Sequence, residues 1–414
     1  MKNCVVIGGG IIGLCSAYYL QKEGCKVAVV DQTNMDAGAS HVNAGYITPS
    51  HFISLAAPGI VTKGLKWMFN SASPLYVKPR LDLDFLKWTL SFKKSATKEK
   101  VEASIPVLKD ISLLGRDLYE DLKQSNAFQF HYERKGLLMC YKTDEVGEEE
   151  WEVGLRGIQE GFGVKNLSKQ EVDVLEPNVD MDIRGAVYYD CDAHMTPKNF
   201  MPQMISYLKA KGVTFFKNER VKDIEVSNGV IKNVITDRQN FMADEVVLAA
   251  GSWSPLMTKK LGLKIPLQAG KGYRIDVEKE TGITYPAILC EARAAVTPMD
   301  GFTRFAGTME FSGINHDINP KRVEAIAKAA ESYYRGLKIS DEDKNAAKCG
   351  LRPCTPDGLP YIGKSSKCKN LTIATGHAMM GWSLGPATGK LVSEAVLNQK
   401  PTLNMQPFSP DRKF

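Results

Sequence analysis

The chain has 414 residues, 43% hydrophobic content and a formal net charge of +6. This length and composition are typical of an ordinary globular protein with a large core and two domains, and they exclude a small disulfide-stabilised scaffold. Nine cysteines form an odd set without metal-type pair spacing, so we expect reduced thiols, no metal and a cytoplasmic location. No secretory leader is evident, and the longest apolar run, residues 5–20, is too short and glycine-rich to cross a bilayer.

The first strand-helix-strand unit carries the strongest signal. Residues 5–32, VVIGGGIIGLCSAYYLQKEGCKVAVVDQ, predict a buried strand, a glycine turn, a helix from Ile11 to about Glu23 and a second buried strand. The glycines form G-x-G-x-x-G, which lets backbone approach a pyrophosphate, and Asp31 lies 23 residues after Gly8, where a carboxylate holds ribose hydroxyls. The predicted dinucleotide contacts are Gly8, Gly10, Ile11, Ile12, Gly13, Asp31 and Gln32. The alternative is a glycine turn in an unliganded α/β protein.

Residues 59–100 form a basic segment with interleaved aromatic side chains. Nine basic residues stand against three acidic ones, an excess equal to the net charge of the whole chain. Such a segment could rest on anionic lipid headgroups, or it could be a core-packing helical hairpin with a solvated basic face, which we favour. Nucleic acid is a weaker third interpretation, because no recognition module accompanies the segment.

The middle of the chain predicts several local elements. Residues 168–171, SKQE, are typical of a capping box, and Thr196 with Pro197 predicts a helix that Gly212 closes. Asn228 and Gly229 predict a hairpin turn. Strand-like alternation then marks residues 185–189, 266–277 and 295–311 as one sheet.

Three widely separated strand-to-glycine junctions favour an extended flavin dinucleotide over a nicotinamide cofactor. The first is the G-x-G-x-x-G turn, which residues 37–50 follow as a loop of small and amide residues. The second strand runs into Gly251, and the third ends near Gly376, before a glycine-rich loop and a helix with Pro386 in its first turn. We therefore expect FAD.

The loop GLRPCTPDGLPYIG, residues 350–363, contains Arg352 directly before a proline. A guanidinium on such a stiffened backbone suits a carboxylate, which it grips with two parallel hydrogen bonds. The alternative is a structural ion pair with Asp357.

With these motifs, the chain resembles the D-amino-acid oxidase and dehydrogenase superfamily of FAD enzymes, in particular bacterial D-amino-acid dehydrogenases and their glycine oxidase relatives. The resemblance spans nearly the whole chain and includes residues 40–50 (SHVNAGYITPS), 73–88, 246–254, 271–277, 304–313, 350–363 and 375–391 (TGHAMMGWSLGPATGKL). It implies an α/β fold with a Rossmann-type, glutathione reductase-like FAD domain interleaved with an antiparallel-sheet α+β substrate domain. The implied FAD domain comprises residues 1–50, 150–260 and 345–414, and the substrate domain comprises 51–149 and 261–344.

The resemblance also implies roles for individual residues. Arg352 binds the substrate carboxylate above the flavin, and Val221 contacts adenine through its backbone. The residues implied to lie along the flavin are Ser40, Asn43, Ala44 and Gly45 on one loop, Gly251 at a strand end, and Met380, Gly381, Trp382, Ser383 and Leu384 at the pyrimidine end. Tyr273 helps to hold substrate or packs in the sheet, and His377 and His41 lie near flavin or are satisfied loop histidines.

Two departures from the family refine the expectation. Met379 stands where glycine oxidase has a second arginine, which favours a larger or less polar substrate than glycine. Cys349 lies one residue out of register with the flavin-linking cysteine of sarcosine oxidases, so non-covalent FAD is expected.

The expected reaction is oxidation of a D-amino acid to its imino or 2-oxo acid by hydride transfer to flavin N5, with electrons passed to a quinone or another carrier. Open alternatives are a hydroxy-D-proline or secondary-amine dehydrogenase, a glycine- or sarcosine-type oxidase, a 2-hydroxyacid oxidase of the same fold, and a non-catalytic flavin-binding subunit. Location at the inner face of a membrane is expected if the basic segment binds lipid.

Overall fold

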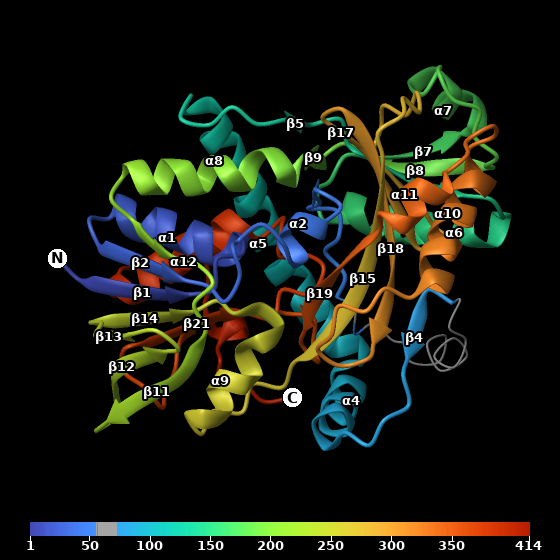
Figure 1. Ribbon diagram of the computed structural model, residues 1–414. Helices are drawn as coiled ribbons and strands as arrows, with labels where there is room; N and C mark the ends of the chain where they lie inside the picture. Colours follow the sequence, from blue (N-terminus) through green and yellow to red (C-terminus); the bar gives the residue numbers. More distant parts are fainter. Residues whose placement is uncertain (55, 57–72) are drawn as a thin grey trace.

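The computed structural model describes residues 1–54, 56 and 73–414, and two large sheets dominate it (Figure 1). The first has six strands in the order β10-β2-β1-β14-β21-β20. Its strands are β1 (Asn3–Ile7), β2 (Lys26–Val30), β10 (Thr214–Phe216), β14 (Glu245–Leu248), β20 (Tyr361–Lys364) and β21 (Leu371–Thr375). All neighbours are parallel except β20 and β21, which confirms the predicted dinucleotide-binding fold.

Both faces of this sheet are covered by other elements. Successive residues of a strand point to opposite sides, and the apolar residues of β1 are buried on both sides. Cys4 and Val6 of β1 pack in a core with helices α1 (Ile11–Lys22), α5 (Lys98–Gln124), α8 (Pro197–Ala210) and α12 (Gly385–Leu397). Val5 and Ile7 pack on the other side, against a three-stranded meander. The meander is β11 (Val221–Ser227), β12 (Val230–Thr236) and β13 (Asn240–Phe241), with α9 (Ser254–Lys260) beside it.

The second sheet has nine strands. Eight follow the order β19-β15-β18-β17-β16-β6-β8-β7, and β4 pairs with β18. These strands are β4 (Leu75–Val77), β6 (Leu137–Tyr141), β7 (Val164–Ser168), β8 (Gly185–Tyr189), β15 (Gln268–Val277), β16 (Ala287–Leu289), β17 (Ala294–Met299), β18 (Phe302–Phe311) and β19 (Lys348–Cys354). Helix α10 (Pro320–Tyr333) packs on one face of β15 and β18, and α6 (Asp144–Gln159) lies over β7 and β8.

A small third sheet lies between the two large ones (Figure 1). It consists of β3 (Tyr46–Ile47), β9 (Ala193–Met195) and β5 (Tyr132–Glu133), with β9 in the centre. Since β3 directly follows the loop at residues 39–45, and the Met195 N–H of β9 donates to the Gly45 carbonyl, this sheet holds the C-terminal end of that loop.

Some local predictions agree with the structure and others do not. The capping box at Ser168 begins α7 (Lys169–Leu175), and Asn228 and Gly229 turn the β11–β12 hairpin with φ of 52° and 70°. Thr196 precedes α8, but its side chain does not cap that helix. The GLRP segment is strand β19 rather than the expected loop, because it pairs with β15 over its whole length.

The sheets divide the chain differently from the expected domain boundaries. Strands β7 and β8 lie within the segment assigned to the FAD domain, yet they pair with β6 in the nine-stranded sheet. Helix α5 lies within the segment assigned to the substrate domain, yet its Ile111 and Tyr119 pack with α1 and α12. We therefore propose that α5 belongs to the FAD domain and that this domain resumes after β8 instead of at residue 150.

Candidate active site

The glycine turn after β1 is fixed by close backbone contacts. Gly8 has φ of 111°, and a Cβ there would lie 2.4 Å from the carbonyl oxygen of Ala249. A Cβ on Gly13 would lie 1.8 Å from the carbonyl oxygen of Gly8. Only glycine therefore lets α1 approach β1 and β14 so closely, which places the N-terminus of α1 where a pyrophosphate binds in such folds.

Asp31, at the end of β2, is oriented toward the same turn. Its Oδ2 accepts a hydrogen bond of 2.7 Å from the Gly9 N–H, and its Oδ1 accepts one of 2.7 Å from the Thr33 N–H. The Glu219 N–H donates to the Asp31 carbonyl at 2.8 Å, which ties the end of β2 to the segment two residues before Val221, the first residue of β11. Gln32 is half-buried next to it.

The loop at residues 39–45 crosses from the glycine turn to the small sheet. The Ile11 N–H donates to Ser40 Oγ at 3.0 Å, and the Gly45 N–H donates to Asn43 Oδ1 at 2.8 Å. Gly45 has φ of 78°, and a Cβ there would lie 2.1 Å from the carbonyl oxygen of Met195. Ala44 is half-buried between them.

Arg304 of β18 holds this loop from the nine-stranded sheet. Its guanidinium is 1% exposed, donates to the carbonyls of His41 at 3.1 Å and Asn43 at 2.6 Å, and pairs with Asp276 at 2.8 Å. Burial lowers the pKa of Arg304 to about 9. Arg304 is not among the site residues predicted from the sequence, because an arginine within a strand pattern shows no sign of the remote carbonyls that it binds.

Strand β19 joins the other predicted flavin segments. The Ser252 hydroxyl, in the 3-10 turn after β14 (Gly251–Trp253), donates to the Leu351 carbonyl at 3.1 Å. The Ala378 N–H, in the loop after β21, donates to the Pro353 carbonyl at 2.9 Å. A Cβ on Gly350 would lie 2.9 Å from Ala39 Cα, so this face of β19 faces the 39–45 loop.

Arg352 projects from the same face of β19 as Gly350. A Cβ on Gly272 of β15 would lie 2.3 Å from Arg352 Cζ, so the guanidinium lies flat over this glycine. Nη1 donates to the carbonyl of Thr308 at 2.7 Å, and burial lowers the pKa of the group.

The expected alternative for Arg352, an ion pair with Asp357, is wrong. Asp357 instead pairs with Arg412 at 2.7 and 3.0 Å. Within residues 1–54, 56 and 73–414, no carboxylate forms an ion pair with Arg352. Arginine retains its proton in proteins, so Arg352 is a cation without an anionic partner in the described part of the chain.

The pyrimidine-end residues lie between β21 and α12. Met380 and Gly381 are half-buried, whereas Trp382 is 1% exposed and packs in the helical core. Ser383 Oγ accepts from the Thr48 N–H at 3.1 Å and donates to the Tyr46 carbonyl at 2.9 Å. The segment that includes Leu384 is therefore tied to the strand that follows the 39–45 loop.

Known proteins of the same sequence family clarify what this arrangement binds. A family model described as FAD dependent oxidoreductase (DAO) matches residues 3–395. The chain belongs to the DAO family of FAD-dependent oxidoreductases. A D-amino acid dehydrogenase of Helicobacter pylori is 32% identical over 394 residues, 95% of this chain and 94% of that protein. A D-amino acid dehydrogenase of Vibrio vulnificus strain CMCP6 is 31% identical, and 96% of each chain is covered. Glycine oxidase from Geobacillus kaustophilus has a similar fold, with a TM-score of 0.77, 21% identity and full coverage of both chains.

The residues of this DAO-family chain fit FAD. The glycine turn leaves backbone next to the α1 N-terminus, Asp31 is oriented beside that turn, and a Cβ on Gly251 would meet nothing within 4 Å. Cys349 lies on the sheet face opposite Arg352, where its thiol donates to the His316 carbonyl at 3.4 Å, which supports the prediction of non-covalent binding. FAD supplies a two-electron acceptor when it is bound.

Tyr273 is not brought together with Arg352. It follows Gly272 on β15 and therefore points to the opposite face, where it is fully buried against α10. Its hydroxyl donates to Glu310 at 2.7 Å, and burial together with that carboxylate raises its pKa. This position favours the packing alternative.

Burial lowers the pKa of both loop histidines. His377 is 2% exposed, its Nε2 lies 2.9 Å from Thr388 Oγ1, and burial lowers its pKa to about 3. His41 Nε2 lies 3.1 Å from the Met35 carbonyl, and burial lowers its pKa as well. The position of His41 favours the satisfied-histidine alternative, whereas His377 fits it only in part, because its buried Nδ1 has no hydrogen-bond partner among the described residues.

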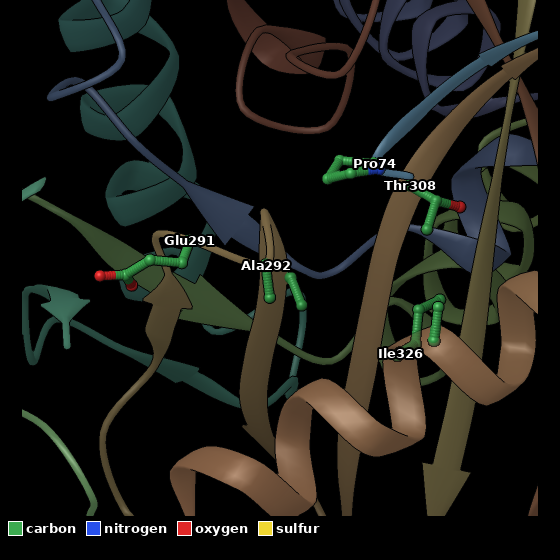
Figure 2. A pocket seen from close by; sticks show the side chains of 7 residues that line it. Pro74, Glu291, Ala292, Thr308 and Ile326 are labelled. Carbon is green, nitrogen blue, oxygen red and sulfur yellow. The ribbon is translucent and has the colours of Figure 1, made fainter. Parts of the chain in front are cut away.

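A separate cavity of about 180 Å³ lies between β17, β18 and α10. Figure 2 shows Thr308 on β18 and Ile326 on α10 at this cavity, together with Pro74 and Ala292. Its lining contains none of the predicted cofactor residues. Thr308 connects the cavity to the candidate site, because its carbonyl accepts the hydrogen bond from Arg352.

Proposed function

We propose that the chain oxidises a D-amino acid to the imino acid, which water then converts to the 2-oxo acid and ammonia. The single observation that carries this proposal is the half-buried guanidinium of Arg352, which has no anionic partner in the described residues. The position of this cation among the predicted flavin segments suits the carboxylate of a bound amino acid. The curated relatives named above support the D-amino acid as substrate class.

The chain's main contribution to the reaction is positioning. Arg352 would hold the substrate carboxylate, so that the α C–H faces the cofactor and the neutral amine lone pair assists departure of the hydride. A neutral amine carries its own lone pair, so hydride departure does not require a protein group to remove a proton first. We therefore assign no side-chain base.

Met379 indicates which side chains the substrate carries. It lies in the loop after β21, is 38% exposed, and offers a flexible thioether instead of a second cation. We propose that D-amino acids with apolar side chains are preferred over glycine.

The substrate screen that tests this proposal uses the bound flavin as its own indicator. Anaerobic addition of D-alanine, D-methionine or D-phenylalanine is expected to bleach the flavin absorbance, whereas their L-enantiomers leave it oxidised. Glycine, D-proline, sarcosine and 2-hydroxy acids are added in parallel, because they represent the substrates of the alternative enzymes. Bleaching only by a hydroxy acid or a secondary amine would contradict the proposal, and flavin that no compound bleaches would favour a non-catalytic subunit.

We further propose that the electron acceptor is reached at an anionic membrane surface, through α4 (Leu83–Ser95). None of the helices in the described ranges is both long and apolar enough to cross a bilayer. One side of α4 packs inward, with Trp88 6% exposed and donating to the Cys354 carbonyl at 2.9 Å. Leucines cover the outer side: Leu83, Leu86 and Leu90 are 73%, 55% and 54% exposed.

Basic residues surround these leucines, which suits anionic headgroups better than neutral ones. Lys87, Lys93 and Lys94 on α4 are exposed. Lys63, Lys66, Trp67 and Phe69, which also contribute to the predicted basic segment, lie outside the described residues. The inward packing of α4 agrees with the core-packing alternative. That alternative does not explain the exposed leucines, which a membrane surface would cover.

Vesicle co-sedimentation tests the membrane proposal. The double variant Leu86→Gln/Leu90→Gln is expected to lose roughly tenfold or more in affinity for anionic vesicles, because each removed leucine contributes about 1 kcal/mol or more of apolar burial. The matched control is Leu155→Gln/Ile158→Gln, which removes two residues of similar exposure, 45% and 44%, from α6. Equal pelleting of both variants, or binding indifferent to salt, would refute the proposal.

A further inference from the structure

The edge of the small sheet carries a cluster of two histidines and a glutamate that the expected reaction does not use. His131 and Glu133 are two residues apart on an extended segment, so their side chains point to the same side. Glu133 of β5 is the direct antiparallel partner of His194 of β9. One donor atom from each of the three residues lies within 4.8 Å of the others.

The distances between these groups are too long for hydrogen bonds but suit ligands around a small ion. Glu133 Oε1 lies 3.7 Å from His131 Nε2, and Glu133 Oε2 lies 3.7 Å from His194 Nε2. Two ligands at about 2.0–2.1 Å from a tetrahedral Zn²⁺ are roughly 3.4 Å apart. The donor atoms of the cluster therefore need to approach one another only slightly to reach the spacing of ligands around a tetrahedral Zn²⁺.

His194 is the observation that points to a ligand. Its side chain is 0% exposed, and neither ring nitrogen forms a hydrogen bond of ordinary geometry with the described residues; the Pro298 carbonyl is a weak backbone acceptor beside the ring. Each ring nitrogen is therefore a buried polar atom without a hydrogen bond of ordinary geometry, and a metal ion would bind one of them. Buried polar groups in folded proteins are normally paired, and neutral imidazole is the form that binds metals.

The second histidine is already oriented for coordination. His131 Nδ1 lies 2.9 Å from Thr196 Oγ1, which also accepts a hydrogen bond of 2.9 Å from the Asp300 N–H. When Nδ1 donates to Thr196, Nε2 keeps its lone pair and faces Glu133. Metal-binding histidines are commonly oriented in this way by a second hydrogen bond.

We propose that His131, Glu133 and His194 bind a divalent transition-metal ion such as Zn²⁺, with water as the fourth ligand. No metal was predicted from the sequence, because the cysteine spacing gives no metal signal and these histidines are 63 positions apart. The site is structural: Met195 follows His194, and its N–H donates to the Gly45 carbonyl at 2.9 Å. The ion thus braces the strand that supports the 39–45 loop.

Lys135 offers an electrostatic test of the metal site, because its ammonium group would compete with the metal ion for the Glu133 carboxylate. Its Nζ lies 2.8 Å from Glu133 Oε2, and its side chain is 39% exposed and able to turn into solvent. A metal ion must displace this ammonium group from the carboxylate. Removing the lysine charge should therefore strengthen metal binding, whereas adventitious binding to surface histidines would not respond.

The experiment titrates chelator-treated, flavin-loaded protein with Zn²⁺ by calorimetry and with Co²⁺ by visible absorption. The wild type is expected to bind one ion per chain with micromolar or tighter Kd and to give the intense bands of tetrahedral Co²⁺. Lys135→Met is expected to bind roughly tenfold tighter, and His194→Gln and Glu133→Gln to lose the site. The matched control is His316→Gln, an exposed histidine outside the cluster, which should bind as the wild type does.

Several outcomes would overturn this inference. Binding that is not stoichiometric, weak octahedral Co²⁺ bands, or a Kd unchanged in Lys135→Met would each exclude the site. If His194→Gln does not fold, the Lys135→Met titration and the Co²⁺ spectrum of the wild type still decide. None of these readouts depends on the substrate that the enzyme oxidises.

Discussion

Replacing Arg352 by glutamine is expected to lower kcat/KM for the D-amino acid substrate by roughly 10²–10³-fold, mainly by raising KM. The guanidinium would form two charge-assisted hydrogen bonds to the carboxylate, and losing such a pair costs about 3–4 kcal/mol. Arg352→Lys retains the charge without the planar fork, so an intermediate loss is expected. Steady-state rates measured over a range of substrate concentrations give kcat and KM for both variants, and the flavin absorbance of each variant should remain that of the wild type.

A second arginine, close to the same motif, provides the matched control. Arg412 pairs with Asp357 at 2.7 and 3.0 Å and lies over the Tyr361 ring at 3.9 Å. Arg412→Gln therefore removes a half-buried structural pair and should lower the midpoint of thermal unfolding, with kcat/KM within a few-fold of the wild type. A similar loss of kcat/KM in both variants, or unchanged saturation in Arg352→Gln, would show that Arg352 does not anchor substrate.

Local sequence signals predicted the elements that depend on neighbouring residues. The G-x-G-x-x-G turn, the capping box at Ser168 and the hairpin at Asn228 each follow from the conformations that a few adjacent residues allow. The helix predicted from Ile11 to about Glu23 ends at Lys22 in the structure. The family resemblance added what local signals lack, namely the joining of distant segments into one cofactor site.

Features that depend on tertiary contacts could not be predicted from the sequence. Alternation along β15 puts Gly272 and Tyr273 on opposite faces, but only the packing of α10 determines which face is the core. Asp357 is nearer to Arg352 in sequence than to Arg412, yet the C-terminal segment folds back to pair with it. Likewise, the carbonyls that Arg304 binds and the meeting of His131 with His194 result from strand pairing, which one sequence does not encode locally.

Substitution of Gly8 by alanine is expected to yield protein that is purified with little or no FAD. The new Cβ would lie 2.4 Å from the carbonyl oxygen and 2.8 Å from the carbonyl carbon of Ala249, which are backbone atoms of the neighbouring strand end. Ala249 cannot retreat easily, because its N–H donates to the Ile7 carbonyl at 2.9 Å. The turn must move instead, which displaces the Gly9 N–H from Asp31 and the α1 N-terminus from the pyrophosphate position. We expect a total cost of about 2–5 kcal/mol, which is shared between the free energy of unfolding and the free energy of FAD binding.

Gly24→Ala distinguishes this steric effect from backbone strain. Gly24 belongs to the same strand-helix-strand unit and has φ of 82°, but a Cβ there would meet nothing within 4 Å. Its substitution costs only the roughly 1–2 kcal/mol of placing a residue with a Cβ in the left-handed backbone region. This variant should therefore be less stable but should retain a full complement of FAD. The ratio of flavin to protein absorbance and the fluorescence titration of apoprotein with FAD measure the two variants side by side. If Gly8→Ala binds FAD as tightly as Gly24→Ala, then the close approach of the turn to Ala249 does not shape the cofactor site.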